Sequence, residues 1–256
     1  DILSIFYIWE GGLELLGGVI CAITVIILYL RYHRLPARDY LDVLAIGLMA
    51  ALVLGRVGCF LNGCCYGEPT EMPWGVRYPY NSIPYRSQVT PDLKRGRTEP
   101  HLKLPAEYFG YTDERGYYHS GLKPKEYLTE RQKQMVEEGE YRALPIHPTQ
   151  LYSSLSALAA GVVLFLFWRR SQSRASRGSP ASGPGCTFAL MFIIYGVMRF
   201  VLELFRDDNP FENAWWIVYK GGTVSQNLGI YMVTGGIIMM IAFDVYNRKS
   251  QLVNSK

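Results

Sequence analysis

Charged residues are scarce over long parts of this sequence, which argues against an ordinary soluble protein. Only 19% of the 256 residues are charged and 49% are hydrophobic, and residues 68–146 hold a large share of the charges. A helix needs roughly 20 consecutive apolar residues to cross a bilayer. Apolar stretches on both sides of a charged insert therefore predict a helical membrane protein.

The chain also lacks an initial methionine and a signal peptide. It begins at Asp1 and continues into an aromatic segment at residues 5–9. A basic start, a short apolar core and a small-residue cleavage site would mark a signal peptide, and this pattern is absent. We interpret the chain as a fragment or processed piece of a longer protein.

Cysteine is sparse and odd in number, with Cys21, Cys59, Cys64, Cys65 and Cys186. An odd count with two members in apolar segments argues against a disulfide framework. The group at 59–65 matches no zinc signature and has no histidine near it in sequence. We favour small residues packed at a helix end, while a disulfide in an oxidising compartment stays open. No metal and no cofactor are expected.

The predicted fold is an all-α polytopic membrane protein with five transmembrane helices and a small external head domain. The spans are expected at about 11–30, 40–57, 147–168, 187–205 and 227–243. The predicted units are residues 1–67, the head domain 68–146, and residues 147–256, which include a flexible linker at 171–185 and a tail at 247–256. Nine tyrosines in the head favour an ordered cap, with a helix at about 124–139.

The basic residues orient these spans. Five alternating crossings place three basic groups on one side of the membrane, whereas the loop 207–225 on the other side carries three acidic residues and one lysine. The groups are Arg31, Arg34 and Arg38; Arg169, Arg170, Arg174 and Arg177; and Arg248, Lys249 and Lys256. The positive-inside rule predicts that they are cytoplasmic and that the head is external.

The fourth span contains charges that a bilayer disfavours. Tyr195, Arg199, Glu203 and Arg206 are spaced by four, four and three residues, so they share one helix face. A charge in hydrocarbon costs roughly 3 kcal/mol or more and therefore faces a bundle interior or a wet cavity. A self-satisfied Arg199–Glu203 pair that joins two helices is the structural alternative. The surplus positive charge instead suggests an anionic ligand.

Two other helix ends on the external side carry polar groups. The second span ends with Arg56, Asn62 and a glycine-rich loop that includes Gly67. Glycines there permit close approach to a ligand, although they often mean only a helix C-cap. The third span opens with His147 and Gln150. A cavity that receives a phosphate-bearing lipid from the outer leaflet would account for all three ends.

These motifs together resemble one family. The chain contains in order W-E-G-G-L, G-R-x-G-x-F-x-N-G-x-x-x-G, H-P-x-Q-L-Y and Y-G-x-x-R-F-x-x-E-x-x-R-x-D, and this series is similar to the bacterial prolipoprotein diacylglyceryl transferases. The resemblance implies an inner-membrane enzyme that transfers diacylglyceryl from phosphatidylglycerol to the lipobox cysteine of a prolipoprotein signal peptide. It implies a multi-pass protein of usually seven spans, with the head in the periplasm and no nucleic-acid partner.

The resemblance also assigns roles to the candidate residues. Arg56 and Arg199 would hold the lipid phosphate, Glu203 would position Arg199, and Arg206 would line the headgroup region. Gly67 would close the signature loop, and the remaining substrate-binding candidates are Asn62, Tyr195 and Gln150.

Three positions depart from the family pattern. Leu16 stands where the family commonly has histidine, and Cys59 and Cys64 stand where it usually has Asn and Glu. The base for the substrate thiol is therefore not identified by the motifs, and His147 is the substitute we expect. The departures also motivate two alternatives, a non-catalytic phospholipid-binding protein and a paralogue with another acceptor. A channel or transporter ranks last because no inverted repeat or ring of polar positions is present.

Overall fold

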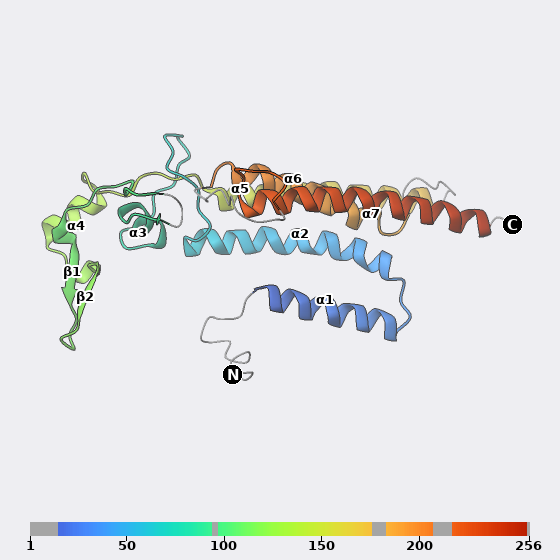
Figure 1. Ribbon diagram of the computed structural model, residues 1–256, viewed down its shortest axis with the longest axis horizontal. Helices are drawn as coiled ribbons and strands as arrows, with labels where there is room; N and C mark the ends of the chain where they lie inside the picture. The colour runs from blue at the N-terminus through green and yellow to red at the C-terminus, as the bar shows by residue number, and fades with distance from the viewer. Residues whose placement is uncertain (1–14, 94–96, 176–182, 207–216, 255–256) are drawn as a thin grey trace.

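The computed structural model describes residues 15–93, 97–175, 183–206 and 217–254 (Figure 1). Four described helices are long and apolar enough to cross a membrane, by length and composition: α2 (Ala37–Asn62), α5 (Thr149–Ala175), α6 (Cys186–Glu203) and α7 (Val224–Asn254). They match four of the five predicted spans. The remaining span falls partly on residues 1–14, outside the described residues, and partly on α1 (Leu15–Tyr32), which is not among these four.

The helices pack closely where side chains are small. A Cβ atom on Gly196 of α6 would lie 2.6 Å from the carbonyl oxygen of Gly229 on α7, and one on Gly229 would lie 2.8 Å from that of Gly196. Backbones approach this closely in membranes mainly where glycine removes the side chain. On its other side α6 contributes Met191 to a core with Ala45 and Met49 of α2 and Ala160 and Leu164 of α5.

The alternation of these helices gathers four helix ends at one end of the bundle, beside the head (Figure 1). They are the C-terminal ends of α2 and α6 and the N-terminal ends of α5 and α7. At the opposite end, Arg38 of α2 donates a 2.9 Å hydrogen bond to Asn247 Oδ1 of α7 and lies 4.2 Å over the ring of Tyr246. Polar contacts therefore join the helices at both ends of an apolar bundle.

The segment between α2 and α5 is compact, and it corrects the all-α prediction. It contains α3 (Ile83–Val89), η4 (Ala106–Tyr108), η5 (Lys125–Tyr127), α4 (Glu130–Glu137) and an antiparallel pair, β1 (Phe109–Thr112) and β2 (Tyr118–Leu122). Buried Tyr85 and Tyr108 anchor its small cores. Burial raises the pKa of Tyr80, which packs on both cores, to about 12.

The single helix predicted at 124–139 is wrong, because it is interrupted after η5. Thr129 begins α4 as its N-cap: its hydroxyl accepts from the Gln132 backbone N–H at 3.3 Å, and Gln132 Oε1 accepts from the Thr129 N–H at 3.0 Å. This reciprocal pair is a capping box, which fixes a helix start within the expected helix.

The observed helix ends also differ from the predicted ones. α2 continues to Asn62 rather than ending near residue 57, so Gly55 and Gly58 are helical with open space around them, and the turn falls at Gly63, whose φ is 71°. α5 and α7 extend into the regions expected as linker and tail. The rest of the expected linker includes residues 176–182, which lie outside the described part.

Candidate functional site

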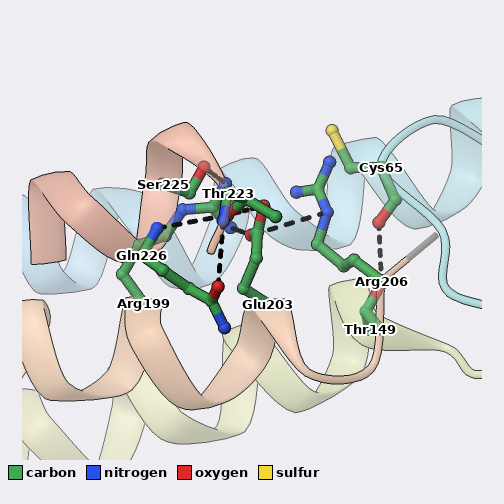
Figure 2. A network of polar contacts seen from close by, with 8 residues as sticks. All are labelled: Cys65, Thr149, Arg199, Glu203, Arg206, Thr223, Ser225 and Gln226. Carbon is green, nitrogen blue, oxygen red and sulfur yellow. Dashed lines mark hydrogen bonds and ion pairs between the residues drawn. The ribbon is translucent and has the colours of Figure 1, made fainter. Parts of the chain in front are cut away.

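Glu203 is the centre of the polar cluster at the gathered helix ends. Its carboxylate is 3.0 Å from Arg199 Nη1, one helical turn earlier, and 3.9 Å from Arg206 Nε, just after α6. The Glu203 side chain is 1% exposed, against 20% for Arg199 and 17% for Arg206. Figure 2 shows Glu203 between the two arginines. The spacing along α6 therefore places one buried carboxylate between two guanidiniums.

Residues at the N-terminal end of α7 provide further hydrogen bonds to this cluster. Thr223 donates its hydroxyl hydrogen to Glu203 Oε1 at 3.0 Å, and Arg199 Nη2 donates to Ser225 Oγ at 2.5 Å (Figure 2). Thr223 and Gln226 exchange backbone and side-chain bonds of 3.0 and 3.2 Å, which forms a capping box at the helix start. The geometry of the arginine cluster is therefore fixed by α6 and α7 together.

Arg56 of α2 brings a third guanidinium to the same place. A small cavity is lined by Arg56, Arg199 and Arg206, together with Cys65, Thr149, Ser153 and Leu202. Arg56 Nε is buried without a hydrogen-bond partner among the described residues. Among the residues that the structure describes, three guanidiniums and one carboxylate, that of Glu203, give this arginine cavity a surplus of positive charge. A buried N–H without an acceptor is costly, and with the surplus of positive charge it makes the cavity suited to a bound anion.

The loop after α2 ties the arginine cavity together through its backbone. The N–H of Gly67 donates to His147 O at 3.0 Å, the N–H of Glu68 donates to Phe205 O at 3.1 Å, and the N–H of His147 donates to Glu68 O at 2.9 Å. Thr149 adds a bond of 2.8 Å from its hydroxyl to Cys65 O (Figure 2). The loop therefore links the start of α5 to the end of α6.

Gly67→Ala is expected to disrupt the arginine cavity. A Cβ at this position would lie 2.3 Å from the backbone oxygen of Phe205, 2.7 Å from Thr149 Cγ2 and 2.8 Å from His147 Cβ. Because backbone cannot move as a side chain can, we expect Phe205 and the end of α6 to shift, with a loss of about 1–3 kcal/mol. Thermal unfolding in detergent measures it. Gly55→Ala, which meets open space in a helix, serves as the control and should match or slightly exceed the wild type in stability.

Four of the predicted binding residues do not line the arginine cavity, and Gly67, in the loop described above, is one of them. Tyr195 packs against the apolar core of α2, α5 and α6. Asn62 is the exposed last residue of α2. Gln150 is buried, and its Nε2 donates to Cys64 O at 2.7 Å and to the hydroxyl of Tyr78 at 3.4 Å. Burial also raises the pKa of Tyr78. In this structure Gln150 supports the loop after α2.

His147 lies beside the arginine cavity and lines a different hollow. Its Nδ1 is 3.1 Å from the hydroxyl of Tyr152, and its ring packs edge-on against Tyr152 and Phe205. These residues line a largely apolar groove of about 540 Å³ with Trp74, Met72, Ser156, Val197, Met198, Val201 and Leu202. Leu202 lines both spaces, so this apolar groove adjoins the arginine cavity.

Several residues at the site were not predicted from the sequence. Thr149 and Ser153 follow His147 on α5 and line the arginine cavity, and Thr223 holds Glu203. A signal for Thr223 was available in T-V-S-Q at 223–226, which has the capping-box spacing. Nothing in the local sequence distinguishes Ser153 from other small polar residues in a membrane helix.

Comparison with known proteins gives a consistent result. The family model for prolipoprotein diacylglyceryl transferase matches residues 1–242. Proteins named phosphatidylglycerol–prolipoprotein diacylglyceryl transferase are similar to this chain in Roseobacter denitrificans (27% identity, 91% of this chain, 63% of the relative), Photorhabdus laumondii (28%, 93% and 65%) and Bordetella parapertussis (27%, 91% and 62%). The chain thus spans just under two thirds of the length of these relatives. With the family match over nearly its whole length, the chain belongs to the prolipoprotein diacylglyceryl transferase family.

Proposed function

We propose that the protein transfers the diacylglyceryl group of phosphatidylglycerol to the lipobox cysteine thiol of a prolipoprotein and releases glycerol phosphate. The names of its relatives support this donor and acceptor class. The observation that carries the proposal is the arginine cavity, which Arg56, Arg199 and Arg206 line and in which Glu203 pairs with Arg199 and Arg206. That charge balance suits the phosphodiester of an anionic lipid.

The arginines have distinct roles in this proposal. Arg56 comes from α2 and Arg199 from α6, so the phosphate is held from two sides. Glu203 orients Arg199 through the 3.0 Å ion pair, and Ser225 fixes the other nitrogen of the same guanidinium. Arg206 borders the headgroup side. Preorganised donors of this kind stabilise charge as it develops on a leaving group.

The reaction exchanges one bond for another. The thiol sulfur attacks the glycerol carbon that bears the phosphate, and a carbon–sulfur bond forms. The carbon–oxygen bond breaks, and its electron pair leaves on glycerol phosphate. The thiol proton must pass to a base, because the thiolate is the nucleophile. Arginine binding of the phosphate lowers the barrier to the departure of this group.

We propose His147 as the base, because leucine, Leu16, stands here at the position where the family commonly has a histidine. It is the histidine that the bundle carries at this end, next to the arginine cavity, and Tyr152 holds its Nδ1. A histidine is suited to accept a proton near neutral pH. The remaining candidates do not contact the phosphate in this proposal. They support the helices and the loop that surround the lipid, and they are Asn62, Gly67, Tyr195 and Gln150.

The apolar groove gives the lipid chains a place. Val197 and Val201 of α6 and Phe205, just after its end, are exposed, and Trp74 of the head borders them. Acyl chains of a lipid in the outer leaflet would lie along these side chains while the phosphate reaches the arginines. We place the protein in the bacterial inner membrane, with the head, residues 68–146, in the periplasm and the basic ends of the bundle in the cytoplasm.

Arg199→Ala is expected to abolish the activity of the full-length protein. The change removes a phosphate ligand and leaves Glu203 buried without its nearest cation. Transfer should fall by about 10²-fold or more, as for other lost oxyanion donors. The measurement is rescue of lipoprotein modification in cells depleted of their own transferase, with release of glycerol phosphate from labelled phosphatidylglycerol in the presence of a lipobox peptide.

The controls separate the competing functions. Lys249→Ala, on an exposed turn at the far end of α7, should rescue as well as the wild type. Rescue by Arg199→Ala would contradict the proposal. Phosphatidylglycerol binding without glycerol phosphate release would instead favour the non-catalytic lipid-binding protein suggested by the changes at Leu16, Cys59 and Cys64.

A further inference from the structure

Three cysteines, Cys59 and the adjacent pair Cys64 and Cys65, meet at the end of α2. Cys59 lies in the last helical turn, and Cys64 and Cys65 follow the helix end. The sulfur atoms of all three lie within 4.8 Å of one another. The spacing C-x4-C-C gave no reason to expect this, because it matches no familiar metal motif.

The backbone turns back on itself after α2, and this turn brings the three thiols together. Gly63 has a φ of 71°, and Cys65 has a φ of 58°, which is unfavourable for a residue with a side chain. The N–H of Cys64 donates to Cys59 O at 3.1 Å, and Gln150 holds Cys64 O at 2.7 Å. Side chains from α5 therefore support a turn whose result is the convergence of the three thiols.

The three thiols are free and only partly buried, so an ion could reach them. No histidine or carboxylate completes the group among the residues that the structure describes. Structural zinc sites nearly always have four protein ligands. Three sulfur donors without nitrogen or oxygen are instead the ligand set of soft ions, of which Cu(I) is the main biological example.

The surroundings are suited to an anionic thiolate complex. Arg56 lies one turn before Cys59 on the same helix face, and Cys65 lines the arginine cavity with Arg56 and Arg206. In Figure 2 the Cys65 sulfur lies on the same side as the Arg206 guanidinium. Neighbouring guanidiniums stabilise thiolates and therefore lower the cost of removing the thiol protons.

We propose that Cys59, Cys64 and Cys65 bind a soft monovalent ion, Cu(I), in a three-coordinate site at the end of α2. Binding forms three sulfur–copper bonds and releases the thiol protons to solvent, with no change in oxidation state. The proposed copper site takes no part in the transferase reaction, although Cys65 also lines the arginine cavity. A copper-binding result would stand whether or not the protein transfers diacylglyceryl.

The test is a competition titration of the full-length protein in detergent, under anaerobic and reducing conditions. Cu(I) is supplied from a coloured Cu(I) chelator, and the wild type is expected to remove about one ion per chain. Cys64→Ser should weaken the affinity by about tenfold or more, and the triple serine variant should remove none. Cys186→Ser changes a buried thiol at the start of α6 and should behave as the wild type.

A second measurement covers serine variants that fail to fold. Cu(I) should protect Cys59, Cys64 and Cys65 of the wild type from alkylation, as mapped by mass spectrometry, and leave the labelling of Cys186 unchanged. Three results would overturn the proposal: equal copper uptake by a folded triple variant, no protection of the three thiols, or displacement of Cu(I) by equimolar Zn(II). A disulfide within the group in protein isolated without reductant would also contradict it.

Discussion

Glu203→Gln is expected to cause a large loss of both stability and activity. The substitution keeps the size of the side chain and an oxygen for the Thr223 hydroxyl. It removes the one carboxylate that, within the described part of the chain, pairs with the arginines of the cavity. Arg199 and Arg206 would then face each other across a neutral amide. Breaking a buried ion pair from one side costs about 3–5 kcal/mol, because the remaining charge is left without compensation.

The activity should fall for a related reason. Without Glu203, Arg199 keeps its bond to Ser225 but loses the partner that sets its direction along α6. We expect glycerol phosphate release to drop by about 10²-fold or more. Thermal unfolding in detergent and the labelled-lipid assay measure the two effects separately.

A matched control lies on α7. Asp244 and Arg248 are also an acid and an arginine four residues apart, with a distance of 2.9 Å, but their side chains are 31% and 59% exposed. Asp244→Asn should therefore change stability by less than about 1 kcal/mol and leave transfer intact. If Glu203→Gln lowered stability and activity as little as this control, Glu203 would contribute no more than an exposed ion pair does. Its proposed role would then be wrong.

The sequence predicted the parts of the site that follow from helix geometry. Spacings of four and three residues along one apolar segment place Arg199, Glu203 and Arg206 together whatever surrounds them. For Arg56, the sequence predicted only that it lies at the same membrane boundary as these residues. Its place in the same cavity depends on how α2, α5 and α6 pack, which no local pattern specifies.

The sequence failed where the loop geometry decides the outcome. Gln150 was expected to face a ligand, yet the turn at Gly63 brings Cys64 O within its reach. The hairpin of β1 and β2 was missed because its strands are only four and five residues long and lack a clear alternation of apolar and polar residues. Short elements of this kind depend on neighbouring contacts more than on their own sequence.

Asp42→Ala is expected to be the most destabilising change outside the site. Asp42 is a buried carboxylate in α2, 3% exposed, and it accepts hydrogen bonds from the backbone N–H groups of Gly185 at 2.9 Å and Phe188 at 2.8 Å. The N-cap residue of α6 is Gly185, which offers no side chain for this purpose. Asp42 therefore acts as the cap of α6 from a different helix.

The size of this effect follows from what the carboxylate replaces. The first N–H groups of a helix have no partner within it, and in an apolar bundle water does not supply one. A negative charge here also interacts favourably with the helix dipole. Hydrogen bonds to a charged group contribute about 1.5–3 kcal/mol each, so the loss of two should cost about 3–6 kcal/mol.

A second variant, Asp42→Asn, tests whether the charge of Asp42 contributes to this stabilisation. The amide keeps one acceptor oxygen without the charge, so its stability should fall between that of the wild type and that of Asp42→Ala. Asp39→Ala, one turn earlier on α2 and half-buried, serves as the control and should have a small effect.

Because Asp42 lies at the end of the bundle opposite the arginine cavity, folded Asp42→Asn should retain transfer activity while it unfolds at a lower temperature. Unchanged melting of Asp42→Ala would show that α6 does not depend on this cap, and that its packing against α2, α5 and α7 is enough to set its position.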